Sequence, residues 1–112
     1  MKKFFIFNLS ILLPLLLFAH PPSDIKISYD LKNSKISVDI LHKTKSSDKH
    51  YIYEIEVFVN DKKVIRQDAT MQINNEGQFL TYVLPGLKVN DKIKVWAECN
   101  KGGDLKKEIV IK

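Results

Sequence analysis

The stretch KIKVWAEC, residues 92–99, decides the fold because small or aliphatic side chains alternate in it with charged or large ones. Its odd-numbered positions are Ile, Val, Ala and Cys, whereas its even-numbered positions are Lys, Lys, Trp and Glu. Since successive side chains of a strand point to opposite faces, this pattern predicts a half-buried β-strand with the odd-numbered residues facing a core. The same period of two recurs at 25–29, 36–40, 51–59, 79–84 and 105–111. The chain is therefore expected to consist mainly of strands.

Turn-forming residues separate these stretches and set the number of strands. Clusters rich in Asn, Asp, Gly, Pro and Ser lie at 32–34, 60–62, 74–77, 85–86, 90–91 and 102–104. After the first 19 residues, no segment sustains the 3.6-residue period of an amphipathic helix. Short strands with a turn signal about every 8–12 residues are typical of a sandwich. We therefore predict an all-β fold, an immunoglobulin-like β-sandwich of seven or eight strands.

The first 19 residues have the organisation of a secretory signal peptide. Met1-Lys2-Lys3 is basic, residues 4–18 are almost wholly apolar, and the composition changes abruptly between Ala19 and His20. The apolar run is shorter than the roughly 20 residues that span a bilayer, and it contains a proline. We expect cleavage of the signal peptide, residues 1–19. The mature domain, residues 20–112, is then exported to the periplasm or the extracellular space, without stable membrane insertion.

The charge of the chain excludes a nucleic-acid partner. The whole chain carries 18 basic and 13 acidic residues, and loss of Lys2 and Lys3 with the leader leaves 16 against 13, a net charge of +3. The remaining lysines are scattered along the chain. A nucleic-acid interface needs a clustered basic stripe, so we interpret these lysines as a solvated surface.

The candidate functional residues are the few side chains that can bind a soft metal. The chain has three histidines and one cysteine: His20, His42, His50 and Cys99. His42 ends one expected strand, His50 begins the next, and Cys99 ends a third on its core-facing side. Imidazole and thiolate suit iron, zinc or copper better than calcium or magnesium. Cys99 has no partner for an intramolecular disulfide, so it is either a small core residue or a thiolate ligand.

Three motifs in this chain resemble the iron domain of the superoxide reductase family, which includes desulfoferrodoxin and neelaredoxin. They are His20-Pro21-Pro22, the segment from Ile40-Leu41-His42 to His50-Tyr51-Ile52, and Cys99-Asn100-Lys101-Gly102-Gly103. The family carries His-x-Pro near its start, His-Pro-Met-x-x-x-His-Tyr-Ile, and Cys-Asn-x-His-Gly near its end. Order and separation match over nearly the whole mature chain. The resemblance implies a seven-stranded immunoglobulin-like sandwich with iron held by four histidines and a cysteine.

The chain departs from the family pattern at three places. Gly102 stands where the fourth histidine belongs, and the lysine that helps to attract superoxide next to the first histidine is absent. The loop between His42 and His50 is two residues longer than is usual in the family. The resemblance therefore implies His20, His42, His50 and Cys99 as metal ligands, and it does not imply the complete reductase centre.

The missing ligand has one candidate replacement. If cleavage follows Ala19, His20 becomes the first residue, and its α-amine and imidazole can chelate one ion, as in a copper site. A frayed terminus is the alternative for His20.

These observations lead to one expected function and two alternatives. We expect an exported iron-binding redox protein, a superoxide-reductase-like oxidoreductase if it is active, with superoxide as substrate and a separate electron-donor protein. The first alternative is a non-catalytic carrier of copper or another metal such as zinc. The second is a metal-free β-sandwich that acts as an interaction module.

Overall fold

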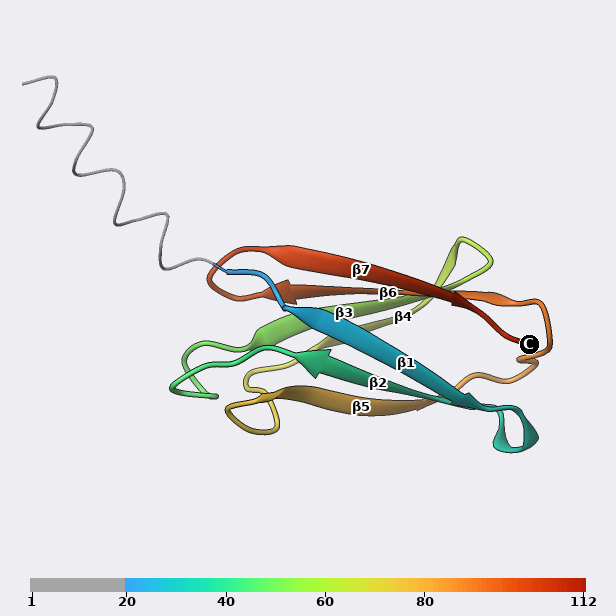
Figure 1. Cartoon of the computed structure of the whole chain (residues 1–112), viewed down its shortest axis with the longest axis horizontal. Coiled ribbons are helices and arrows are strands. Elements are labelled where there is room, and N and C mark those ends of the chain that lie inside the picture. The colour runs from blue at the N-terminus through green and yellow to red at the C-terminus, as the bar shows by residue number, and fades with distance from the viewer. Residues whose placement is uncertain (1–19) are drawn as a thin grey trace, which may run out of the picture.

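Seven strands build the domain, as the computed structural model of residues 20–112 shows (Figure 1). The predicted signal peptide, residues 1–19, lies outside the described residues. A single 3-10 turn, η1 at Leu31–Asn33, joins the first two strands. No helix in the described part of the chain is long and apolar enough to span a membrane. The strands are β1 (Asp24–Asp30), β2 (Lys35–Leu41), β3 (Ile52–Val59), β4 (Lys62–Asp68), β5 (Gly77–Val83), β6 (Lys92–Cys99) and β7 (Asp104–Val110).

The strands form two antiparallel sheets that pack face to face. One sheet has the order β1-β2-β5, and the other has the order β4-β3-β6-β7 (Figure 1). The side chains between the sheets are almost all aliphatic and fully buried. These core residues include Ile25, Ile36, Val38, Ile40, Ile52, Ile55, Val57, Ile93, Val95, Ala97 and Ile111. The predicted all-β sandwich is confirmed, with seven strands.

The strand β6 follows the alternation that predicted it. Its burial alternates at every position, with Ile93, Val95 and Ala97 fully buried and Cys99 only 1% exposed. β6 lies between β3 and β7, so both of its edges are hydrogen-bonded. A central strand of this kind needs one apolar face, which is the face that the sequence supplies.

One strand carried no signal in the sequence. β4 has the sequence KKVIRQD, and its residues are exposed or half-buried. It pairs with β3 at the edge of its sheet through a hairpin whose two turn residues, Asn60 and Asp61, have φ of 51° and 70°. Two consecutive positive φ angles define the turn type that matches strand twist, and Asn and Asp tolerate it. The turn, rather than an apolar pattern, therefore creates β4.

The predicted alternation of β3 was wrong at its beginning. The pairing with β6 shifts between Ile52 and Glu54, where β3 contains an irregularity of the β-bulge kind. An extra residue in one strand reverses which face the side chains before it occupy. Ile52 is therefore fully buried, whereas Tyr53 is half-exposed and donates a hydrogen bond to Glu98. Glu54 is also only 8% exposed, although the period of two at 51–59 places it on the face opposite Ile55 and Val57.

The antiparallel topology brings four strand ends to one end of the sandwich. The first residue of β1, Asp24, pairs with the last residue of β2, and the first residue of β3, Ile52, pairs with Cys99 at the end of β6. His20 precedes β1, His42 follows β2, and His50 precedes β3. We call this the ligand end of the sandwich.

Candidate metal centre

The three histidines of the chain form one cluster at the ligand end. Each pair of imidazole rings among His20, His42 and His50 has its centroids 4.6–4.8 Å apart. One ring nitrogen from each residue lies within 4.8 Å of the others. His20 and His42 are 22 positions apart in the chain, and His42 and His50 are 8 positions apart. The fold thus brings side chains from three separate segments to one place.

Cys99 lies against one member of this cluster, His50. Its Sγ is 3.1 Å from Nε2 of His50, and the residue is 1% exposed. The backbone N–H of Lys101 points to the sulfur at 3.4 Å. The predicted inward position of Cys99 at the end of its strand is confirmed. All four sequence-predicted candidates are therefore at the ligand end of the sandwich.

Gln72 fixes the orientation of His42, and sequence reasoning missed it. The Gln72 amide nitrogen donates to the backbone oxygens of His42 at 2.8 Å and Asn74 at 3.0 Å. Its Oε1 therefore faces the other way, where it accepts from the N–H of Ile52 at 3.1 Å and from Nδ1 of His42 at 2.9 Å. Since this oxygen can only accept, Nδ1 of His42 carries the proton.

The second ring nitrogen of His42 is left without a partner. His42 is 1% exposed, and its Nε2 is buried with no hydrogen bond. With the proton on Nδ1, Nε2 presents a lone pair into the cluster. A buried polar atom without a partner is costly, and a bound ion is one of the few physical explanations. A histidine held by a hydrogen bond on its far nitrogen is also the usual arrangement of a metal ligand.

Asn100 holds His50 against Cys99. Its Oδ1 accepts from the N–H of Tyr51 at 2.9 Å, and its Nδ2 donates to the carbonyl of Lys49 at 3.0 Å. The N–H of Asn100 also donates to the carbonyl of Tyr51 at 2.9 Å. These bonds tie the residues on both sides of His50 to the residue after Cys99. The short distance between imidazole and thiol is therefore a consequence of the backbone arrangement.

Burial shifts the pKa values of three groups at the ligand end, namely His42, His50 and Cys99. Burial lowers the pKa of His42, although the hydrogen bond that its Nδ1 donates to Gln72 opposes the shift. Burial, followed by the neighbouring His42 and His20, lowers the pKa of His50. Burial raises the pKa of the Cys99 thiol, and the N–H and positive charge of Lys101 partly oppose it. Burial of His42 and His50 thus favours the neutral imidazole that metal binding requires, and the thiol would release its proton when a metal binds.

The turn after Cys99 is tight and contains two glycines, Gly102 and Gly103. The turn closes through bonds from Gly102 N–H to Cys99 O and from Cys99 N–H to Gly103 O, both 3.0 Å long. Gly102 and Gly103 have φ of 102° and 95°, in the region that favours glycine. Any other residue at position 102 would therefore have a strained backbone conformation. Gly102 lines a cavity of about 360 Å³ beside Cys99.

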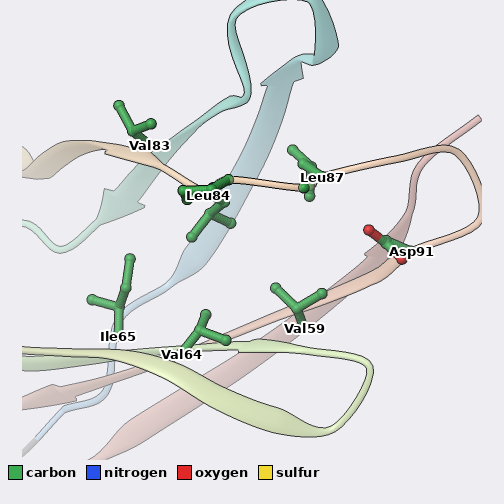
Figure 2. A pocket seen from close by; sticks show the side chains of 9 residues that line it. Val59, Val64, Ile65, Val83, Leu84, Leu87 and Asp91 are labelled. Carbon is green, nitrogen blue, oxygen red and sulfur yellow. The ribbon is translucent and has the colours of Figure 1, made fainter.

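A second cavity lies at the opposite end of the sandwich and has a different character. It has a volume of about 250 Å³ and lies where the end of β3 and the edge strand β4 meet the segment after β5 (Figure 2). Its walls are aliphatic, apart from Asp91, whose carboxylate accepts from the Asn60 amide and binds the Lys88 ammonium. This cavity contains no set of metal-binding or nucleophilic side chains.

Comparison with known proteins supports the fold assignment. No family model and no curated protein matches the sequence. The one-iron superoxide reductase of Giardia intestinalis has a similar structure, with a TM-score of 0.56 and 17% identity over 82% of this chain and 97% of that chain. A proposed superoxide reductase of Thermotoga maritima gives a TM-score of 0.49 and 19% identity over 83% of this chain and 86% of that chain. This protein therefore has the fold of superoxide reductases, and its three histidines form a possible metal site at one end of that fold.

Proposed function

We propose that the protein is an exported redox protein that holds iron at His20, His42, His50 and Cys99. One observation carries this proposal: three imidazoles and a thiol meet at one end of the sandwich, and the buried Nε2 of His42 has no partner. Metal–nitrogen and metal–sulfur bonds of about 2.0–2.3 Å require donor atoms roughly 3–4 Å apart. The 3.1 Å between His50 Nε2 and Cys99 Sγ already meets that requirement, whereas the histidine nitrogens, which lie within 4.8 Å of one another, would have to close by about 1 Å.

The chemistry of the donors favours a redox-active ion. Three imidazoles with one thiolate suit iron, copper or zinc, and the likeness to a one-iron superoxide reductase supports iron. Bound iron would supply one-electron exchange with a small oxygen species. Cys99 would donate electron density from its thiolate, and the N–H of Lys101 would tune that sulfur through its hydrogen bond.

The surroundings of the site suit an anionic substrate such as superoxide. The positive charge of Lys101 acts on both His50 and Cys99. This lysine belongs to the chain's own Cys99–Gly103 turn, and sequence reasoning did not assign it a role. It would attract an anion to the ligand end in place of the family lysine that is missing beside His20. A separate electron-donor protein would then return the protein to its reduced state.

Metal binding is tested by adding one equivalent of Fe²⁺ without oxygen and then oxidising the protein. We expect one iron per chain and a visible sulfur-to-iron charge-transfer band. Cys99→Ser should abolish the band. Ala97→Ser is the matched control, because Ala97 is a fully buried small residue on the same face of β6 and lies outside the donor set. A band that survives Cys99→Ser would reject the thiolate ligand.

Activity is tested by stopped-flow decay of superoxide with the iron-loaded protein. Because Gly102 supplies no ligand, we expect slower decay than in family members with the complete centre. A Lys101→Ala variant should slow the decay further and reduce its dependence on ionic strength. Unchanged kinetics in that variant would remove Lys101 from the mechanism.

A carrier of copper or zinc is the second candidate, and the three-histidine cluster favours it. Neutral imidazole is a common ligand of both metals. The metal content of protein recovered from its export compartment distinguishes the candidates. Copper or zinc in place of iron would support the carrier. A protein that contains no metal and keeps its stability in strong chelator would support a metal-free interaction module.

A further inference from the structure

The main chain of His20 lies against the turn that lacks the fourth histidine. A Cβ atom at Gly103 would lie 2.7 Å from the nitrogen of Pro21 and 3.1 Å from the carbonyl carbon of His20. Gly103 follows directly after Gly102 in the turn that begins at Cys99. The backbone of His20 therefore packs on this turn. Gly102, in the same turn, is the position at which the superoxide reductase family carries its fourth histidine.

The imidazole of His20 is held at the same place. Its ring centroid is 4.8 Å from that of His42 and 4.6 Å from that of His50. Its Nδ1 lies 3.4 Å from the carbonyl oxygen of Pro21, so this nitrogen is turned toward the main chain. His20 thus brings its ring to the ligand end, and its backbone nitrogen is bonded to the Cα that carries this ring.

We propose that the α-amine of His20 is a fifth donor of the metal site and replaces the imidazole that Gly102 lacks. This inference rests on the proposed metal-binding function and adds a ligand to it. The amine and Nδ1 of His20 would form one chelate, for which Nδ1 gives up its 3.4 Å contact with the Pro21 carbonyl oxygen. His42, His50 and Cys99 would provide the other donors. The ligand class is a first-row transition-metal ion.

The donor exists only after the signal peptide has been removed. In the precursor, the nitrogen of His20 belongs to the peptide bond with Ala19, and its lone pair is delocalised into the carbonyl. Hydrolysis of that bond by a signal peptidase adds the OH of water to the Ala19 carbonyl carbon and a hydrogen to the His20 nitrogen. The resulting amine has a free lone pair once it is deprotonated, and it loses a proton when it binds a metal. The site is then completed by export, and the precursor holds metal more weakly.

The test compares two proteins that differ by one residue. One begins at His20 and the other at Ala19, and both contain every strand of the sandwich, since β1 begins at Asp24. Co²⁺ is the probe, because it reports thiolate and nitrogen ligation by visible absorption and does not displace the proton of an amide. Loss of a direct donor should cost at least about the tenfold in affinity that is typical of losing a supporting group. We therefore expect Co²⁺ to bind the protein with Ala19 at least about tenfold more weakly.

A second measurement observes the amine directly. Both proteins are treated with an amine-acylating reagent with and without Co²⁺, and acylation is read by mass spectrometry of the N-terminal peptide. We expect Co²⁺ to protect the amine of the chain that begins at His20. The amine of the chain that begins at Ala19 and the ammonium of Lys62, on the edge strand β4, should show no protection.

The outcomes separate this inference from the proposed function. Equal affinity of both proteins for Co²⁺, or an unprotected His20 amine, would overturn the amine ligand and leave a site of three histidines and a cysteine. Failure of both proteins to bind Co²⁺ would overturn the proposed function as well. A mature chain that begins elsewhere than at His20, as measured by intact mass after export, would also overturn the inference.

Discussion

Replacing Gln72 by alanine should weaken the metal site more than it weakens the fold. Gln72 is completely buried, and its amide makes four hydrogen bonds. Two of these bonds hold His42, one at the ring and one at the backbone. In Gln72→Ala the ring loses the acceptor that keeps the proton on Nδ1. His42 can then carry its proton on Nε2, which is the nitrogen that faces the cluster.

The magnitude follows from the bonds that are lost. A typical internal hydrogen bond contributes about 1 kcal/mol net. Water entering the cavity would satisfy part of the exposed groups, so we expect the free energy of unfolding of the apo protein to fall by about 2–4 kcal/mol. Loss of a group that orients a metal-binding histidine commonly reduces metal affinity by about 10–100-fold.

Gln78 provides the matched control. It is a second buried glutamine, 7% exposed, and its amide bonds to the N–H of Ile73 at 2.9 Å and the carbonyl of Met71 at 3.0 Å. It makes no bond to the histidines. With two bonds lost, Gln78→Ala should lower the free energy of unfolding by about 1–2 kcal/mol. Its Co²⁺ affinity should stay within about twofold of the wild type, since no donor is oriented by it.

The assay combines urea unfolding of the apo proteins with Co²⁺ competition titrations. Nitrogen-15 NMR of the imidazole of His42 adds a direct measure of which ring nitrogen carries the proton. The reasoning is refuted if Gln72→Ala and Gln78→Ala lose affinity only in proportion to their loss of stability. A wild-type His42 with its proton on Nε2 would refute it at the first step.

Three further predictions concern the glycine turn and the histidines. In Gly103→Ala a Cβ would lie 2.7 Å from the Pro21 nitrogen, so the Pro21 backbone should move away from the turn. Co²⁺ binding should then weaken at least about tenfold. A binding titration together with urea unfolding separates this effect from misfolding. Gly102→His should lower apo stability by about 1–3 kcal/mol because φ is 102° at that position, and iron titration would reveal any gain in affinity. Because the pKa of His42 lies below 6.5 in the folded state, the unfolded state binds more protons, so chelator-treated protein should lose stability as the pH falls below 6.5. Equal urea midpoints at pH 7.5 and 5.5 would contradict this last prediction.

The period of two predicted the fold well because odd- and even-numbered residues of a strand face opposite sides of its sheet, and only one side faces the core. The stretch at 92–99 became a central strand with the predicted face inside. The alternation gave the wrong faces at the start of β3, because the irregularity before Glu54 depends on pairing with β6 rather than on the local sequence. It also missed β4, whose edge position requires no apolar face.

The candidate site was predictable to the extent that it consists of rare side chains at strand ends. Three histidines and one cysteine leave few combinations, and the antiparallel topology brings their strand ends together. Gln72 could not be predicted, because it lies in an irregular loop and acts through its amide contacts to a residue 30 positions away. Lys101 was visible in the sequence, but only the turn after Cys99 places its charge beside the thiol.

The distribution of donors between the two sheets has a mechanical consequence. His20 and His42 flank strands of the three-stranded sheet, whereas His50 and Cys99 belong to the four-stranded sheet. An ion bound by all four would act as a cross-link between the layers, in a domain whose single cysteine allows no covalent one. Ligation of the folded state alone adds RT ln(1 + [L]/Kd) to its stability, which is about 2.7 kcal/mol at a hundredfold excess over Kd. The lifetime of the folded protein would then follow the local supply of metal.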